Sequence, residues 1–214
     1  MFSPVQPKVW RWETPDPEDH WVMIGHLLQE GDHVVLVDPP MVPKLTEALM
    51  VLGGVSAIIL TTHDHTRGAR YVSEMFSCPV YVPVQANAER IDQAGIKNTL
   101  LYDETTLLPA GLKAYRCQVE PPMWQDASHP YLDEMMLVTL TGAVACGDIV
   151  MGSADGRLWG CPEGFNNPAD LQKVFASLNT FKRILPPSVD TLLSAHGIDI
   201  VGDLQSQLQQ RLAN

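Results

Sequence analysis

The sequence predicts an α/β (α+β) protein, a four-layer αββα sandwich of two mixed β-sheets packed face to face with helices on the outer faces. Three observations predict it. The N-terminal part carries several strand-like segments, the middle alternates short strands with short helices, and the C-terminal part again has strands followed by helices. Each half combines a sheet with covering helices, so the two sheets are expected to bury their inner faces against each other.

The N-terminal segments are predicted to form an antiparallel meander. Strands are expected over 8–13, 20–29 and 33–38. Turn formers at 14–17 separate the first two strands. Two prolines follow Asp38, and proline cannot continue a ladder of hydrogen bonds, so the third strand ends there.

The middle of the chain has the alternation that is typical of an α/β layer. The spacing of apolar residues predicts a helix over 42–52, which ends at Gly53 and Gly54. Two more helices are expected over 68–77 and 85–94. Strands are expected over 57–60, 78–83 and 99–102.

The C-terminal part repeats the pattern. Thr141 and Gly142 form a plausible hairpin turn between two strands, and Asn167-Pro168 can cap a helix with one apolar face. The segment 152–159 is rich in turn formers, which leaves open a plain loop or a loop with specificity residues. Strands are expected over 113–120, 134–140, 143–146 and 191–194, and a closing helix over 201–212.

Composition limits the class of protein. The 214 residues are 45% apolar, enough for one sizeable core, and there is no repeat or flexible linker, so a single domain over 1–214 is expected. With 25 acidic and 14 basic residues the formal net charge is −11. Such a surface repels phosphate backbones and anionic lipid, so neither nucleic acid nor a membrane is an expected partner.

The cysteines and the N-terminal segment bear on location. Cys78, Cys117, Cys146 and Cys161 show no CxxC spacing and lie in or beside apolar segments, as buried reduced thiols do. The N-terminal segment lacks the pattern of a signal peptide, and no apolar run is long enough to span a bilayer. A cytoplasmic protein is the expectation.

Chemistry-bearing side chains follow the predicted strands. His63 and His65 come just after an apolar strand, His196 comes after another, and Asp148 has the same kind of position. Residues at strand ends are held by a rigid sheet and remain open to a cleft. His63 and His65 are two residues apart, so in extended backbone they point the same way and can bind one ion.

These residues carry a resemblance to a known family. Leu60-Thr-Thr-His63-Asp-His65 resembles the metal-binding loop of the metallo-β-lactamase superfamily, which reads Thr-His-x-His-x-Asp-His. Val35-Leu-Val-Asp38 resembles its early strand, Cys146-Gly-Asp148 its Gly-Asp motif, and Ser194-Ala-His196-Gly197 the segment with its last histidine. The order agrees over nearly the whole chain. The resemblance implies the αββα fold and metal-dependent hydrolase chemistry.

Two residues depart from the family motif. Arg67 and Gly68 stand where the family has Asp and His for a second metal ion. Arginine is permanently charged and offers no lone pair, so the second site is predicted to be lost. Three roles for Arg67 stay open: it replaces the metal by an ion pair with Asp148 or Asp64, it binds an anionic group of a substrate, or it blocks a metal.

The resemblance implies that a first metal site remains. Its ligands would be His63, His65 and, by elimination, His129, with Asp148 or water completing a tetrahedron around one zinc ion. The segment around His129 lacks the usual Gly-His-Thr-Pro-Gly context. Asp38 could orient an imidazole from outside the ligand set.

Three functions follow, in order of preference. The first is a metal-dependent hydrolase of an ester, lactone or thioester-type small molecule. There Asp148 accepts a proton from water, His196 is a general acid or oxyanion donor, and Arg67 and Trp124 contact substrate. The second is a non-catalytic binding or scaffolding module. The third, an iron oxidoreductase, needs more carboxylate ligands than the sequence offers. A small-molecule substrate is the expected partner, and a homodimer is left open.

The other aromatic and histidine residues are predicted to be structural. Trp10, Trp12 and Trp21 alternate on strands as a packed sheet face does. His26 and His33 have no partner at a useful spacing, so no functional role is expected for them.

Overall fold

The computed structural model describes residues 1–17, 21–120, 131–160 and 168–213, and for 168–170 the backbone alone. Its larger sheet has seven strands in the order of the sequence. The first four are antiparallel, and β4 to β7 are parallel. The strands are β1 (Ser3–Gln6), β2 (Val9–Pro15), β3 (Val22–Glu30), β4 (His33–Val37), β5 (Ala57–Ile59), β6 (Val80–Pro83) and β7 (Thr99–Tyr102).

The smaller sheet has the order β13-β10-β9-β8, in which β10 and β13 are parallel and the other pairs antiparallel. Both sheets are therefore mixed, as predicted. A separate two-stranded sheet pairs β11 with β12. These strands are β8 (Lys113–Val119), β9 (Leu132–Val138), β10 (Ala143–Cys146), β11 (Val150–Gly152), β12 (Leu158–Gly160) and β13 (Thr191–Ser194).

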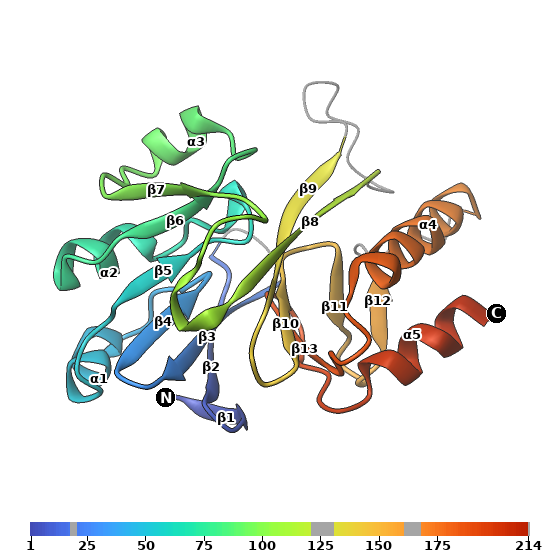
Figure 1. Cartoon of the computed structure of the whole chain (residues 1–214), viewed down its shortest axis with the longest axis horizontal. Coiled ribbons are helices and arrows are strands. Elements are labelled where there is room, and N and C mark those ends of the chain that lie inside the picture. Colours follow the sequence, from blue (N-terminus) through green and yellow to red (C-terminus); the bar gives the residue numbers. More distant parts are fainter. Residues whose placement is uncertain (18–20, 121–130, 161–167, 214) are drawn as a thin grey trace.

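Helices cover the outer faces (Figure 1). The first three helices flank the larger sheet, and the last two lie on the far side of the smaller sheet. They are α1 (Leu45–Val51), α2 (Ala69–Phe76), α3 (Ala88–Gln93), α4 (Pro168–Ile184) and α5 (Leu204–Ala213), with short 3-10 turns η1 (His63–His65) and η2 (Pro109–Gly111). The predicted αββα sandwich is confirmed. In the described ranges, the longest and most apolar helices still fall short of what a membrane span needs.

The hairpin β11–β12 corrects the interpretation of 152–159 as a loop at both ends of that segment. Gly152 and Leu158–Trp159 are strand, whereas 153–157 form the turn that was expected, and Leu158 is fully buried. Gly152 is part of a strand because it packs against backbone: a Cβ added there would lie 2.1 Å from the carbonyl oxygen of Ile198. Gly152 is thus a glycine because two backbone segments approach closely, whereas Gly156, with φ of 82°, belongs to the turn over 153–157.

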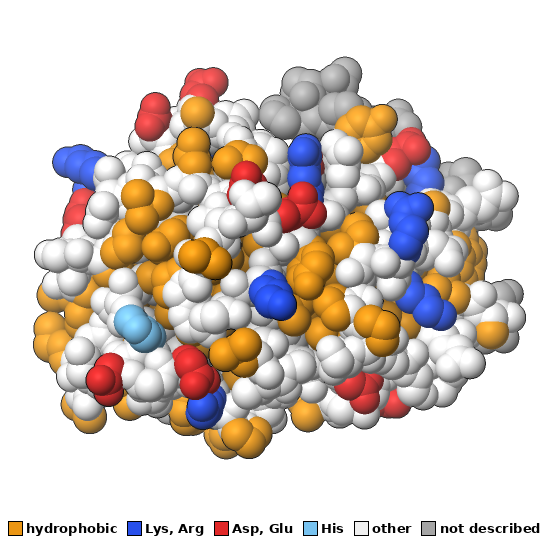
Figure 2. Space-filling model, in the orientation of Figure 1, with side chains coloured by type: hydrophobic (Ala, Val, Ile, Leu, Met, Phe, Trp, Pro, Cys, Tyr) orange, Lys and Arg blue, Asp and Glu red, His pale blue; other side chains and the backbone are white. Residues whose placement is uncertain are grey.

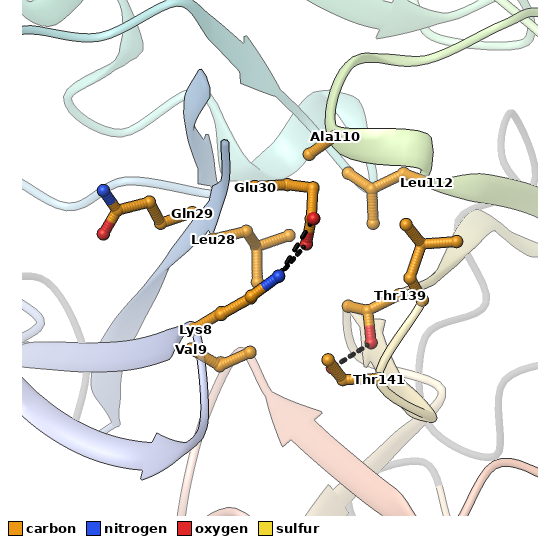
Figure 3. Close-up of a pocket in the computed structure, with 10 residues that line it drawn as sticks. Lys8, Val9, Leu28, Gln29, Glu30, Ala110, Leu112, Thr139 and Thr141 are labelled. Atoms are coloured by element: carbon orange, nitrogen blue, oxygen red, sulfur yellow. Dashed lines mark hydrogen bonds and ion pairs between the residues drawn. The ribbon is translucent and has the colours of Figure 1, made fainter. Parts of the chain in front are cut away.

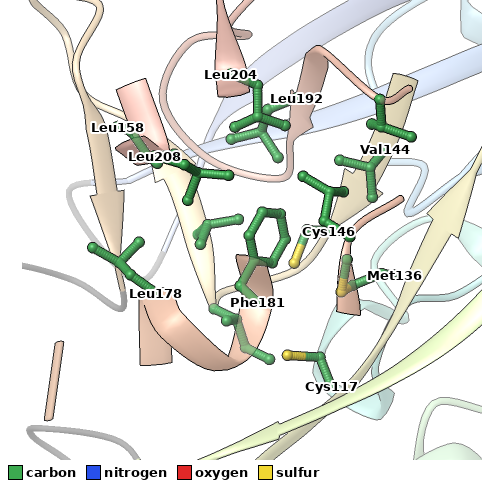
Figure 4. Packing of buried hydrophobic residues seen from close by; sticks show 14 of the residues in the cluster. Cys117, Met136, Val144, Cys146, Leu158, Leu178, Phe181, Leu192, Leu204 and Leu208 are labelled. Atoms are coloured by element: carbon green, nitrogen blue, oxygen red, sulfur yellow. The ribbon is translucent and has the colours of Figure 1, made fainter. Parts of the chain in front are cut away.

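Three apolar layers hold the sandwich together. The first lies between the sheets, the second joins α1 and α2 to the larger sheet, and the third joins α4 and α5 to the smaller one. Figure 4 shows the ring of Phe181 from α4 at the centre of the third layer, beside Cys146. Cys78, Cys117 and Cys146 are buried, as predicted; Cys161 lies outside the described residues.

Candidate metal centre

The candidate site lies where parallel strands end at one edge of the sandwich. Asp38 follows β4, η1 with His65 comes after β5, Asp148 follows β10, and His196 follows β13. Since β4 is parallel to β5 and β10 to β13, the carboxyl ends of each pair meet. Donor atoms of His65, Asp148 and His196 lie within 4.8 Å of one another. Three segments far apart in the sequence therefore form one cluster.

His65 is fixed between two carboxylates. Its Nδ1 lies 3.0 Å from Oδ2 of Asp38, and its Nε2 lies 3.4 Å from Oδ1 of Asp148. Asp38 is held in turn by Thr61, whose backbone N–H donates at 2.8 Å and whose hydroxyl donates at 2.5 Å. Both Asp38 and His65 are buried. A carboxylate on one ring nitrogen of histidine is the arrangement that orients the other nitrogen toward a metal.

The two carboxylates make His65 cationic in the metal-free protein. Burial and the charge of Arg67 would lower the pKa of His65, but Asp148 and Asp38 outweigh them and raise it to about 9. Burial alone would raise the pKa of both aspartates, but the charge of His65 and its hydrogen bonds lower them instead. At neutral pH an imidazolium therefore bridges two carboxylates.

His196 is neutral and its second nitrogen is already bonded. Nδ1 donates to the carbonyl oxygen of Val22 at 2.9 Å, so Nε2 carries the lone pair and accepts from Nη2 of Arg67 at 3.0 Å. Burial lowers the pKa of His196 to about 4; Asp148 opposes this, and His65 and Arg67 add to it. In this arrangement Nε2 has no proton to give and no free lone pair for a metal.

Arg67 lies beside the cluster, where it donates to Nε2 of His196 and to backbone carbonyl oxygens. Nη1 donates to the carbonyl oxygens of Ile24 at 2.8 Å and Asp38 at 3.3 Å, and Nη2 donates to that of Ala195 at 3.4 Å. Asp64 forms an ion pair with Arg90 instead. The guanidinium thus ties β3, the end of β4 and the His196 loop together.

Gly68, which stands where the similar motif has a histidine, lies in a tightly packed loop. A Cβ at this position would lie 2.6 Å from Cγ of Met41 and 2.8 Å from the carbonyl oxygen of Pro39. The backbone N–H of Gly68 donates to that same carbonyl at 2.8 Å. Any side chain would push against a hydrogen-bonded backbone, so the loop is packed as glycine requires.

Glu134 is a site residue that sequence reasoning missed. It is 1% exposed in β9, and its carboxylate accepts from the backbone N–H of Asp148 at 2.7 Å and of Ile149 at 3.3 Å. A Cβ on Gly147 would lie 2.8 Å from this carboxylate, so the glycine of the Gly-Asp pair makes room for it. Burial and the charge of Asp148 raise the pKa of Glu134 to about 8, against the two N–H bonds. The available signal was the pair Asp133-Glu134 at the start of an apolar strand, since alternation directs one of two neighbouring acids to the buried face.

Solved structures with a similar architecture are metallo-β-lactamases. The DIM-1 metallo-β-lactamase matches with a TM-score of 0.67 and 14% identity over 100% of this chain and 95% of its own. The metallo-β-lactamase from Erythrobacter litoralis matches at 0.68 and 19% over 99% and 94%. The FIM-1 enzyme from Pseudomonas aeruginosa, in its mono-zinc form, matches at 0.68 and 15% over 100% and 94%.

The chain has the metallo-β-lactamase fold. No protein-family model and no curated protein matches the sequence. The TM-scores establish the shared fold. Because the sequence identities are low, the activity has to be argued from the site itself.

Within this fold, the structure brings together only part of the predicted ligand set. His65, Asp148 and His196 form the cluster, whereas Nε2 of His63 lies 3.7 Å from Oδ2 of Asp64, its neighbour in the chain. His129 and Trp124 lie outside the described residues. The zinc ligand set of His63, His65, His129 and Asp148 therefore stays a prediction.

A second cluster of polar side chains joins the loop after β13, which contains His196, to the larger sheet. Oδ1 of Asp199 lies 3.0 Å from Nε2 of His26 and accepts from the N–H of Ser194 at 2.9 Å, and Nη1 of Arg11 lies 3.4 Å from Oδ2. His26 is thus structural, as expected, although its partner is 173 residues away. Trp12 is buried and Trp21 packs edge-on against His196.

Replacing Asp199 with asparagine is expected to lower the free energy of unfolding at pH 7 by about 2–3 kcal/mol, since it removes a charged acceptor from buried donors. Burial would raise the pKa of Asp199, but His26 and Arg11 lower it. Because the pKa of Asp199 is lower in the folded state, its carboxylate contributes stability above the unfolded pKa of about 3.9. This contribution is lost as the pH falls from there through the folded-state pKa. Urea unfolding of both proteins from pH 7 to pH 3 should therefore show the difference shrinking with acid; a constant difference would contradict this.

A small pocket of about 20 Å³ lies at the other end of the sheets (Figure 3). It is lined by the β1–β2 turn, the end of β3, the region of η2 and the turn after β9. Nζ of Lys8 and the carboxylate of Glu30 meet there at 2.9 Å, and Thr139 bonds Thr141. Glu30 ends the nine-residue β3, whose start contacts His196. This pocket is thus remote from the candidate metal centre.

Proposed function

We propose that the protein is a metal-dependent hydrolase that uses one zinc ion to activate water and acts on an ester, lactone or thioester-type small molecule. The observation that carries this is the Asp38–His65 pair, which aims Nε2 of a buried histidine at the carboxylate of Asp148 at 3.4 Å. Solved structures with the same fold are metallo-β-lactamases, which supports a metal-dependent reaction.

The donor chemistry suits one ion better than two. Loss of the Nε2 proton would leave His65 and Asp148 as a nitrogen and an oxygen ligand of the kinds that zinc prefers. His63 and His129 are the proposed remaining ligands. His196 and the position of Arg67 belong to the second site, where a guanidinium already donates to Nε2. When bound, zinc lowers the pKa of water toward neutrality and polarises a carbonyl.

The side chains around the ion have separate tasks. Asp38 keeps the Nδ1 proton of His65, and Asp148 is ionised at neutral pH and accepts a proton from the attacking water. Glu134 holds Asp148 through the backbone N–H groups of the turn. A general-acid role for His196 or anion binding by Arg67 first requires these two residues to release each other.

The test is hydrolysis of a panel of esters, lactones and thioesters by the zinc-loaded protein. Turnover is expected with at least one class, lost on treatment with a chelator and recovered with zinc. Asp148→Asn should lose turnover while it keeps the fold by circular dichroism. Turnover that survives both the chelator and Asp148→Asn would contradict the proposed mechanism.

Asp38→Asn is expected to weaken zinc binding about 10–100-fold, because the amide no longer holds His65 as a carboxylate does. Competition with a chromogenic chelator measures this affinity. Asp155→Asn is the matched control, since Asp155 sits in the tip of the β11–β12 hairpin and pairs with Arg157. Equal losses in both variants would show that Asp38 has no special role.

One observation favours a second candidate, a binding module without metal. In the metal-free protein two cations, His65 and Arg67, balance the carboxylates of Asp38 and Asp148, so the cluster is complete as a salt-bridged core. This candidate predicts that zinc neither binds nor stabilises the protein.

A further inference from the structure

The edge strand β7 carries an exposed apolar surface. Leu100 is 45% exposed and Leu101 67%, whereas Tyr102 is buried in the layer between the sheets. Figure 2 shows hydrophobic side chains gathered over β6 and β7 on this face. An edge strand usually carries a charge or a proline that discourages pairing, and Thr99–Tyr102 has neither.

The free backbone groups of β7 can be assigned from its pairing with β6. The carbonyl oxygens of Asn98 and Tyr102 accept from β6 at 2.8 and 3.0 Å. Because alternate residues of a strand face opposite neighbours, Leu100 also faces β6, and Thr99 and Leu101 direct their N–H and C=O groups outward. No strand of the described ranges pairs with this edge, since β7 ends the sheet.

We propose that β7 pairs with β7 of a second copy of this chain, antiparallel across a two-fold axis at Leu100. Outward-facing residues must oppose each other, so Thr99 pairs with the partner's Leu101 and Leu101 with the partner's Thr99. Leu100 then meets the partner's Leu100. The sheet of one copy continues into that of the other.

The charges at the ends of β7 and the N–H of Asp103 favour this register and a second copy of the chain as the partner. Lys97 comes to lie opposite the partner's Asp103, so each end of the ladder joins opposite charges, which a two-fold pair repeats twice. A ladder centred on Leu100 is made by the outward groups of Thr99 and Leu101 alone. A ladder centred on Leu101 needs the N–H of Asp103 to pair with Thr99 within the strand, and that N–H already donates to Oγ1 of Thr106 at 3.0 Å. Self-complementary charge identifies a second copy, even though the net charge of −11 opposes association.

Stable interfaces bury about 800 Å² on each partner. A four-residue strand buries less than that, so we expect a weak dimer. Sedimentation velocity from about 1 to 300 μM should show a dimer with a Kd in the micromolar range. Leu101→Lys and Lys97→Glu should each weaken it at least about tenfold. Leu140→Lys is the matched control, since Leu140 is 66% exposed in the turn between β9 and β10.

Hydrogen exchange supplies a readout without mutation. Protection of the outward N–H groups of Thr99 and Leu101 should rise with protein concentration, while the protection of N–H groups in exposed turns stays constant. A protein that is monomeric over the whole range, or a dimer that Leu101→Lys leaves intact, would overturn the proposal. Neither result bears on the metal centre, since β7 contributes no residue to it.

Discussion

Replacing Arg67 with methionine is expected to lower the free energy of unfolding of the zinc-free protein by about 3–5 kcal/mol, the usual loss when one partner of a buried ion cluster is removed. Without the guanidinium, His65 alone opposes the carboxylates of Asp38 and Asp148, and the carbonyl oxygen of Ile24 loses the hydrogen bond from Arg67. Urea unfolding in the presence of a chelator measures the loss.

Arg70→Met is the control for the same chemical change three residues on. Arg70 is exposed on α2 and forms a surface ion pair with Glu74 at 3.1 Å, so its replacement should cost about 0–1 kcal/mol. Zinc should restore part of the stability of Arg67→Met, since a divalent cation can replace the lost charge. Equal losses in the two variants would mean that Arg67 does not stabilise the cluster.

The second large effect is expected from His65→Ala, which should weaken zinc binding at least about a hundredfold, because it removes both a proposed ligand and the partner of Asp38. His33→Ala is the control, since His33 is exposed at the start of β4. Isothermal titration with zinc measures both. If His65→Ala binds zinc as the unaltered protein does, the proposed ligand set is wrong.

Much of the fold was predictable because short apolar runs alternate with strong turn signals. The strand over 99–102 has the predicted bounds, and the helix over 68–77 differs by one residue at each end. What failed were short strands with a weak sequence signal, although their partners are near in the chain. β1 has four residues, of which none is buried, and β11 begins within buried residues but ends at Gly152, which sequence alone marks as a turn.

The site was predictable in its elements and not in its connections. Histidines and Asp148 after strands could be recognised locally, since sheet ends place such residues together. The partners of Arg67 could not, because Ile24, Asp38 and Ala195 offer backbone carbonyls, which carry no sequence signal. Of the roles left open, its hydrogen bonds favour replacement of the second metal over capture of a substrate anion.

The most direct test of the proposed site is the zinc content of the protein purified without chelator, measured by elemental analysis and by titration to saturation. About one zinc per chain is the predicted result, because His65 and Asp148 are proposed ligands of one ion, while Nε2 of His196 already accepts a hydrogen bond from Arg67. Two zinc ions per chain would contradict the role of Arg67. A protein that takes up none would contradict the metal-dependent hydrolase.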